Sequence, residues 1–395
     1  MKMVTCIYLL SGLCLWLGFK RNLYFSTCYL FLGYFFLVYF PWQISTSWKD
    51  YYLASFLLCF SLGSCFYFNL PTLFVNSDRS KNLVKKIIVG VCGFLFLLAT
   101  SRIIYRWLPI QKNYVNIRLL LALNINYWEY LCFFKISLFI LPLFSFSLRN
   151  KFFKIFFWLL SACVLCIPLH KSLVFFYCLV SFFSLFLLKN TNRLVLKCKT
   201  VFIFACIIYF FIWLIFCIFN QRFLPLSSVV SRTFTSVKKI SYLGLDYAYK
   251  NKVYSCGASS FSKMYCLFSK NKVQQRLDKK ILSLYAGVDE SKISSGAGAN
   301  TPTPIPLYVD FGWYALIFAF LLGMYLKTID ILMINFCSDN RITPLIAISY
   351  SCCLVGSSLF MITAMGTALL SGGILLYSVL LFLFMNLERK PKKES

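Results

Sequence analysis

Apolar runs of membrane-spanning length alternate with short basic connectors along nearly the whole chain. A transmembrane helix needs about 17 to 25 mostly apolar residues, because the hydrocarbon core is ~30 Å thick and a helix rises about 1.5 Å per residue. The pattern therefore predicts an all-α polytopic membrane protein with eleven transmembrane helices. The predicted spans cover residues 3–19, 23–40, 51–70, 87–104, 128–148, 152–169, 172–188, 200–219, 307–326, 344–365 and 367–386.

One polar segment interrupts this pattern, from Asn220 to Leu307. Its 88 residues carry thirteen Lys and Arg against four Asp and Glu, a net formal charge of +9. A surface with this charge favours an anionic partner. The predicted domains are thus eight membrane helices in 1–219, a large basic loop in 220–307, three membrane helices in 308–386 and a basic tail in 387–395.

The short connectors predict the orientation, because Lys and Arg in short loops mark the cytoplasmic side. With eleven helices, most basic connectors and the C-terminal tail share one face, so the 220–307 loop lies outside the cytoplasm. Loops longer than ~60 residues do not follow this charge rule. The connector 105–127 also places Arg106 and Arg118 outside; either it too faces an anion, or the helix count differs by one there.

Composition excludes a soluble domain, because 60% of the residues are hydrophobic and only 13% are charged, against about 25% charged in ordinary soluble domains. Most of the 18 cysteines lie in predicted spans. Cys256 and Cys266 share the loop, where they form either a disulfide or two free thiols. With a single histidine and no nucleotide-binding motif, we expect no metal, no cofactor and no nucleic-acid partner.

Several ionisable residues lie at the predicted outer face. His170 and Lys171 sit between two spans, where they either contact an anionic head group or extend to the membrane interface. Asp310 enters the ninth span, where it either complements the helix dipole or takes part in proton transfer. Lys135 lies at membrane depth, so we expect it to face a protein cavity. The apolar stripe of a basic segment, 263–285, is expected to lie along the membrane surface.

The spans, the late outer loop and the passage from Asn300-Thr-Pro-Thr-Pro to Tyr308-Val-Asp-Phe-Gly resemble the Wzy-type O-antigen or capsule repeat-unit polymerases of bacterial inner membranes. Arg276 to Gly287 fits an Arg-x10-Gly pattern that some members carry. Lys171 stands where that family often has an arginine, and lysine offers a point charge in place of a bidentate fork. The resemblance implies a GT-C-like architecture with the large loop in the periplasm.

The resemblance implies a metal-independent glycosyltransferase of lipopolysaccharide biosynthesis. It would join undecaprenyl-pyrophosphate-linked oligosaccharide repeat units on the periplasmic face of the inner membrane, with membrane lipid and a chain-length regulator as further candidate partners. Candidates for accepting the proton of the acceptor hydroxyl are Asp310, Asp246 and His170. Candidates for binding the substrate are Arg222, Arg232, Arg276, Lys171, Arg106, Arg118, Asn300 and Gly287.

Three other classes stay open at this point. An O-antigen ligase shares the general plan and the lipid donor but uses lipid A core as its acceptor. A lipid-linked oligosaccharide flippase or other transporter would concentrate charge along a central path, whereas this chain concentrates it in one loop. A non-enzymatic scaffold in a membrane assembly is the third alternative.

Overall fold

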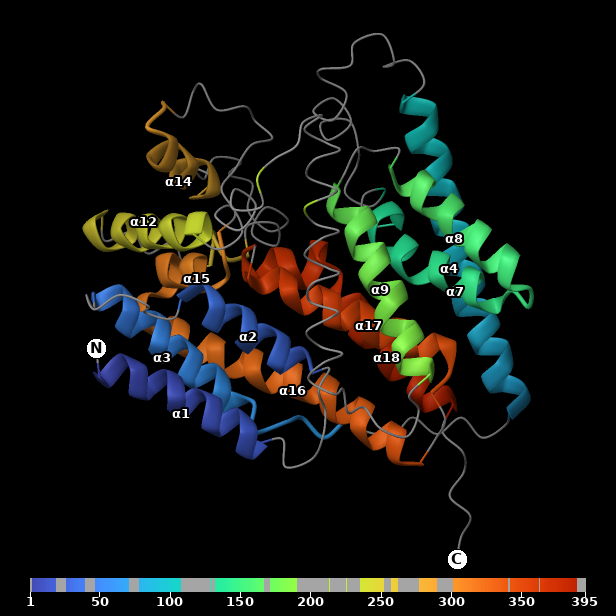
Figure 1. Cartoon of the computed structure of the whole chain (residues 1–395), viewed down its shortest axis with the longest axis horizontal. Coiled ribbons are helices and arrows are strands. Elements are labelled where there is room, and N and C mark those ends of the chain that lie inside the picture. The colour runs from blue at the N-terminus through green and yellow to red at the C-terminus, as the bar shows by residue number, and fades with distance from the viewer. Residues whose placement is uncertain are drawn as a thin grey trace, which may run out of the picture.

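A computed structural model describes most of the chain, and within that part all regular structure is helical (Figure 1), which confirms the predicted all-α class there. The described residues are 2–18, 26–39, 47–70, 78–107, 129, 132–166, 171–189, 213, 225, 235–251, 257–261, 277–289, 301–339, 342–361 and 363–388.

Ten of the eleven predicted spans contain described helix, and the predicted span 200–219 lies outside the described residues apart from Trp213. Additional α-helices lie inside the loop. The described α-helices are α1 (Lys2–Gly18), α2 (Thr27–Tyr39), α3 (Trp48–Gly63), α4 (Asp78–Trp107), α7 (Ser137–Ser147), α8 (Lys151–Cys166), α9 (Lys171–Lys189), α12 (Ser236–Asn251), α14 (Leu277–Ala286), α15 (Pro304–Phe311), α16 (Ala315–Asp339), α17 (Pro344–Ser358) and α18 (Ile374–Glu388). Short 3-10 helices are η5 (Gly312–Tyr314) and η6 (Leu359–Met361), and short π-helices are η2 (Cys132–Ile136) and η7 (Thr367–Ser371).

Three of the described helical stretches are long and apolar enough to cross a membrane: Ser80–Tyr105, Pro304–Cys337 and Pro344–Met361. The second of these joins α15, η5 and α16 into one stretch of 34 residues. Shorter apolar helices occur in α1, α2, α9 and α18. By length and composition the chain is therefore an α-helical membrane protein.

The helices α1, α2, α3 and α16 pack side by side as one group (Figure 1). Two glycines bring α3 and α16 into close contact: a Cβ at Gly63 would meet the backbone carbonyl of Phe320, and a Cβ at Gly323 would meet that of Phe60. Small residues permit such close backbone approach between membrane helices.

The second group surrounds α17, which contacts α9, α18, α7 and α2. Every residue of α17 from Ile346 to Ser357 is buried, as expected for a helix enclosed on all sides. The exposed apolar side chains gather on the outer helices instead: α4 and α8 present Phe94, Leu97, Phe152 and Ile155, each more than half exposed. These faces are suited to lipid.

Asp330, in the second half of α16, connects the two groups. Its carboxylate accepts the backbone N–H groups of Thr27 (2.9 Å) and Cys28 (3.3 Å) at the start of α2. It also accepts the hydroxyls of Ser26 (2.5 Å) and of Tyr350 in α17 (2.9 Å). Because the first N–H groups of a helix lack intrahelical partners, the carboxylate satisfies them and complements the helix dipole.

The helices of the polar loop, α12 and α14, gather with α15 at one end of α1, α2 and α3 (Figure 1). Tyr39, the last residue of α2, shares a hydrogen bond of 2.7 Å with Ser241 of α12. Tyr52 of α3 donates to the carbonyl of Pro304, at the start of α15 (2.8 Å). The stripe expected at the membrane surface is buried only in part: Ile281 of α14 is fully buried against α12, whereas Tyr285 of the same stripe is 42% exposed, and residues 263–276 lie outside the described part of the chain.

Candidate functional site

The candidate site is built on the first turn of α3. Ser47, directly before the helix, donates its backbone N–H (2.8 Å) and its hydroxyl (3.0 Å) to the Asp50 carboxylate. This serine and the acidic residue three positions later form a capping box, which stabilises a helix start by satisfying its unpaired N–H groups. The box fixes the first turn of α3, including Lys49.

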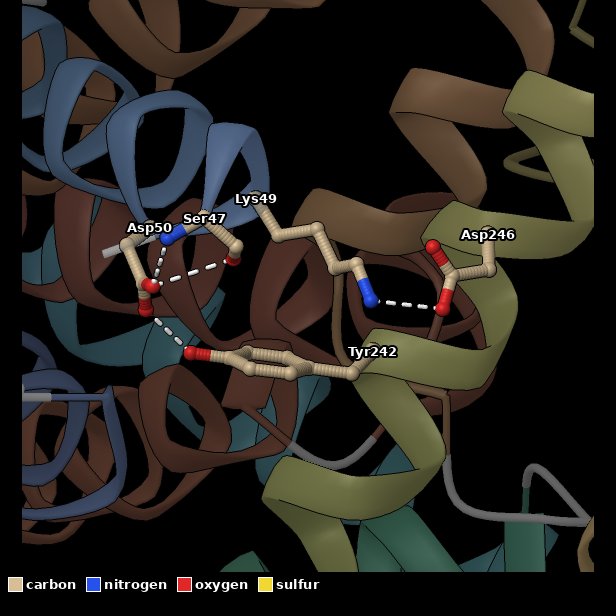
Figure 2. A network of polar contacts seen from close by, with 5 residues as sticks. All are labelled: Ser47, Lys49, Asp50, Tyr242 and Asp246. Atoms are coloured by element: carbon tan, nitrogen blue, oxygen red, sulfur yellow. Dashed lines mark hydrogen bonds and ion pairs between the residues drawn. The ribbon is translucent and has the colours of Figure 1, made fainter. Parts of the chain in front are cut away.

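Two side chains of α12 bond to this turn, and Figure 2 shows that they approach it from one side. The Tyr242 hydroxyl donates to Asp50, and the Lys49 ammonium pairs with Asp246 at 2.5 Å. Lys49 also lies 5.2 Å from the centre of the Tyr242 ring, within cation–π range. The site thus joins two helices that begin nearly two hundred residues apart.

The sequence of α12 explains why these two side chains point the same way. Tyr242 and Asp246 are four residues apart, so they lie on one face of the helix. Gly244, between them, is covered by Ile305 and Ile281, because a Cβ there would come within 2.6 and 2.9 Å of their side chains. Close packing against α14 and α15 therefore fixes the rotation of α12.

Burial divides the site into a closed half and an open half. Asp50 is 4% exposed, and burial, followed by the hydrogen bond to Asp50, raises the pKa of the Tyr242 hydroxyl well above its ordinary value. The phenol therefore stays protonated and donates. The Asp246 side chain, by contrast, is 37% exposed and that of Lys49 is 16% exposed. Asp246 can therefore meet a ligand while Lys49 holds its orientation.

Asp310, the second described candidate for proton transfer, is 2% exposed. Its two carboxylate oxygens accept the backbone N–H groups of Ser259 (2.9 Å) and Ser260 (2.5 Å). The Ser260 carbonyl in turn accepts the N–H of Gly366, between α17 and α18 (2.8 Å). These contacts give Asp310 an architectural role, because they hold the 257–261 turn between α15 and the last two helices.

A further charged group consists of Arg102 on α4, Glu129, and Lys135 in η2. The Arg102 guanidinium is 3.6 Å from the fully buried Glu129 carboxylate, with 53% of the arginine side chain exposed. Lys135 is buried in η2, so its side chain lies inside the protein and not toward lipid. Its aliphatic chain packs against Gly373, and its backbone carbonyl accepts a hydrogen bond from Tyr377 (3.1 Å).

The other sequence candidates are placed as follows. Gly287 follows α14 with φ +65°, the left-handed conformation that glycine commonly supplies after a helix end. Lys171 begins α9 and Arg106 lies in the last turn of α4, but their side chains lie outside what the structure describes. Also outside the described residues are His170, Arg118, Arg222, Arg232, Arg276, Asn300, Cys256 and Cys266.

Lys49, Asp50 and their contacts with α12 are absent from the sequence-based candidates. The available signal is the run Trp48-Lys-Asp-Tyr-Tyr52, which places both charges among aromatic residues at the start of a predicted span. Among the described residues, no group of three or more His, Cys, Asp or Glu side chains is arranged to hold a metal ion.

Fold and site together define an α-helical membrane protein with a polar cluster between its loop helices and one end of its bundle. No family model, no curated protein and no solved structure matches this chain.

Proposed function

We propose that this protein is a polymerase of lipid-linked oligosaccharide repeat units, of the O-antigen or capsule type, in the bacterial inner membrane. It transfers a growing glycan from undecaprenyl pyrophosphate to a hydroxyl of an incoming lipid-linked unit. Eleven membrane helices and a periplasmic 220–307 loop are part of this proposal.

One observation carries the proposal: Asp246, a partly exposed carboxylate of the basic loop, is held by Lys49 at the end of the bundle where α15 leads into α16. A glycosyl transfer needs a base for the acceptor hydroxyl and positive charge for the leaving pyrophosphate. Asp246 supplies the base, and the loop, with its net charge of +9, supplies the positive charge.

The proposed glycosyl transfer needs no cofactor, because every bond formed is matched by a bond broken between the two substrates. The acceptor oxygen forms a bond to the anomeric carbon of the donor glycan while the bond from that carbon to the pyrophosphate oxygen breaks. The electron pair of the broken bond leaves with undecaprenyl pyrophosphate, whose charge the Lys and Arg side chains of the loop stabilise. The hydroxyl proton passes to the Asp246 carboxylate, and Lys49 orients that carboxylate.

The contacts of the loop helices support the proposed threading. Eleven spans put the end of α2 and the start of α3 on the same outer face as the loop. Tyr39 and Tyr52 mark those two ends, and both bond to the loop region, through Ser241 and Pro304. The helix ends expected outside therefore lie where the loop packs.

Deletion of the gene tests the proposal. Cells that lack a polymerase still transfer single repeat units, so lipopolysaccharide gels of the deletion strain should show core bearing at most one unit and no ladder. Loss of even the single unit would instead support the ligase or the flippase. An unchanged ladder would contradict all three.

A further inference from the structure

A line of aromatic rings runs beside the Lys49–Asp246 pair. The Trp48 ring centre is 5.0 Å from that of Tyr249 and 5.5 Å from that of Tyr308. Tyr52 continues the line, 4.7 Å from Tyr308 and 5.5 Å from Trp313. Ring centres at 4.5–7 Å interact favourably. The five rings come from α3, α12, α15 and η5, so contacts between elements fix the line.

The middle of this line is buried and its ends are open. Tyr52 is fully buried and Tyr308 is 3% exposed, whereas Tyr249 is 62% exposed and Trp313 is 50% exposed. Tyr249 therefore presents a ring that is supported on one side by Trp48 and open on the other. Trp313 belongs to a stretch that can span a membrane, where interfacial tryptophan is common. Tyr249 belongs to the loop helix α12.

The open end carries polar groups as well as rings. Asp246 is three residues before Tyr249, so the two side chains lie on neighbouring positions of one face of α12. Lys49 follows Trp48 in sequence and pairs with Asp246. A ring face next to a carboxylate and an ammonium matches a pyranose, which has an apolar face of C–H groups and a rim of hydroxyls. Binding sites of this kind combine apolar surface with a few oriented polar groups.

We propose that Trp48 and Tyr249 form a saccharide-binding site for a pyranose of the incoming lipid-linked unit, with the sugar stacked on Tyr249 and a hydroxyl directed at Asp246. This inference rests on the proposed function and names the acceptor site of the same reaction. The chemical class of the ligand is an oligosaccharide with an unsubstituted hydroxyl, and the line of rings connects that site to the membrane-entry end of α16.

Direct binding tests this site without requiring catalysis. The probe is an oligosaccharide of one to three repeat units, released by mild acid from the bacterium's own surface polysaccharide and measured by saturation-transfer NMR with the purified protein. Taking the sugar–ring contact as equal to an aromatic pair, about 0.5–1.5 kcal/mol, Tyr249→Ala should weaken binding roughly 2- to 12-fold. Tyr249→Phe keeps the ring and should bind nearly as the wild type.

Tyr105→Ala is the matched control, because Tyr105 is 78% exposed on α4, away from the line of rings. It should leave binding unchanged. Equal binding by wild type and Tyr249→Ala would overturn the saccharide site, and so would equal losses in Tyr249→Ala and Tyr105→Ala. If the deletion strain kept a normal ladder while Tyr249→Ala still lost binding, the polymerase would be refuted and the saccharide site would stand.

Discussion

At the residue scale, hydrogen-bond partners distinguish the carboxylates of this protein. Asp330 accepts hydrogen bonds from three successive residues and from Tyr350, and Asp50 accepts them from Ser47 and Tyr242. Asp310 accepts two backbone N–H groups. These three are buried, whereas Asp246 pairs with one lysine and is over a third exposed. Buried carboxylates with several donors are suited to architecture, and the exposure of Asp246 leaves it accessible to a ligand.

The loop arginines give the residue-scale prediction. Arg222, Arg232 and Arg276 should act through charge directed at the pyrophosphate, because they lie in a polar loop. Loss of one charge-assisted contact raises the barrier by about 2–4 kcal/mol, a rate loss on the order of a hundredfold. Each alanine variant should therefore lose the long glycan chains of the lipopolysaccharide ladder on a gel. Each lysine variant should keep part of the ladder.

The control for these variants is Arg149→Ala, because Arg149 lies in a connector predicted to be cytoplasmic; its ladder should match wild type at equal membrane levels on a blot. If all three loop alanine variants keep full ladders, the loop does not bind the anion. The better candidates would then be Arg102, Arg106, Arg118 and Lys171.

The sequence alone predicts which residues are candidates better than it predicts which side chains are in contact. Asp246 is recognisable as a candidate because it is one of four acidic residues in a basic loop. Lys49 is not, because its partner lies 197 residues away, and no local pattern specifies a contact over that separation. Glu129 and Lys135 are six residues apart, so they are not neighbours on a helix; the partner of Glu129, Arg102, is supplied by another helix.

At the element scale, apolar runs predict where helices form, because length and hydrophobicity are local properties. They do not predict which helices touch. The amphipathic stripe around Ile281 illustrates this: its apolar face is equally suited to a membrane surface and to another helix, and α12 covers Ile281 while Tyr285 stays exposed. The contact between α3 and α16 likewise depends on two glycines, Gly63 and Gly323, that are far apart in sequence.

Substitution at that contact is the element-scale prediction. Gly323→Leu should separate α3 from α16, because its side chain would meet the backbone of Phe60 and Ser64. Overpacking costs about 1–3 kcal/mol, and backbone contact puts this case at the upper end. Thermal unfolding of the purified protein in detergent should show a Tm lower by several degrees.

Gly93→Leu is the matched control, since it makes the same change in α4, where no atom of another element lies within 4 Å of the added Cβ. Its Tm should stay close to that of the wild type. Equal Tm values for the two variants would show that the glycine contact between α3 and α16 does not contribute to stability.

At the scale of the whole molecule, the proposed function requires that one end of the bundle faces the periplasm. The loop helices, the end of α2 and the start of α3 meet there. Reporter fusions after Lys252 and after Ser395 should consequently report opposite compartments, periplasmic for the first and cytoplasmic for the second. The same compartment for both would refute the eleven-helix threading.

Polymerisation by the purified protein tests the central claim most directly. Wild-type protein in detergent, given lipid-linked repeat units and a chelator but no nucleotide, should produce a ladder of lengthened glycans. Asp246→Asn keeps the shape of the side chain but removes the base, so it should lower the rate at least about a hundredfold, while Tyr105→Ala should match wild type. A wild-type protein that lengthens no glycan, or an Asp246→Asn variant as active as wild type, would contradict the account.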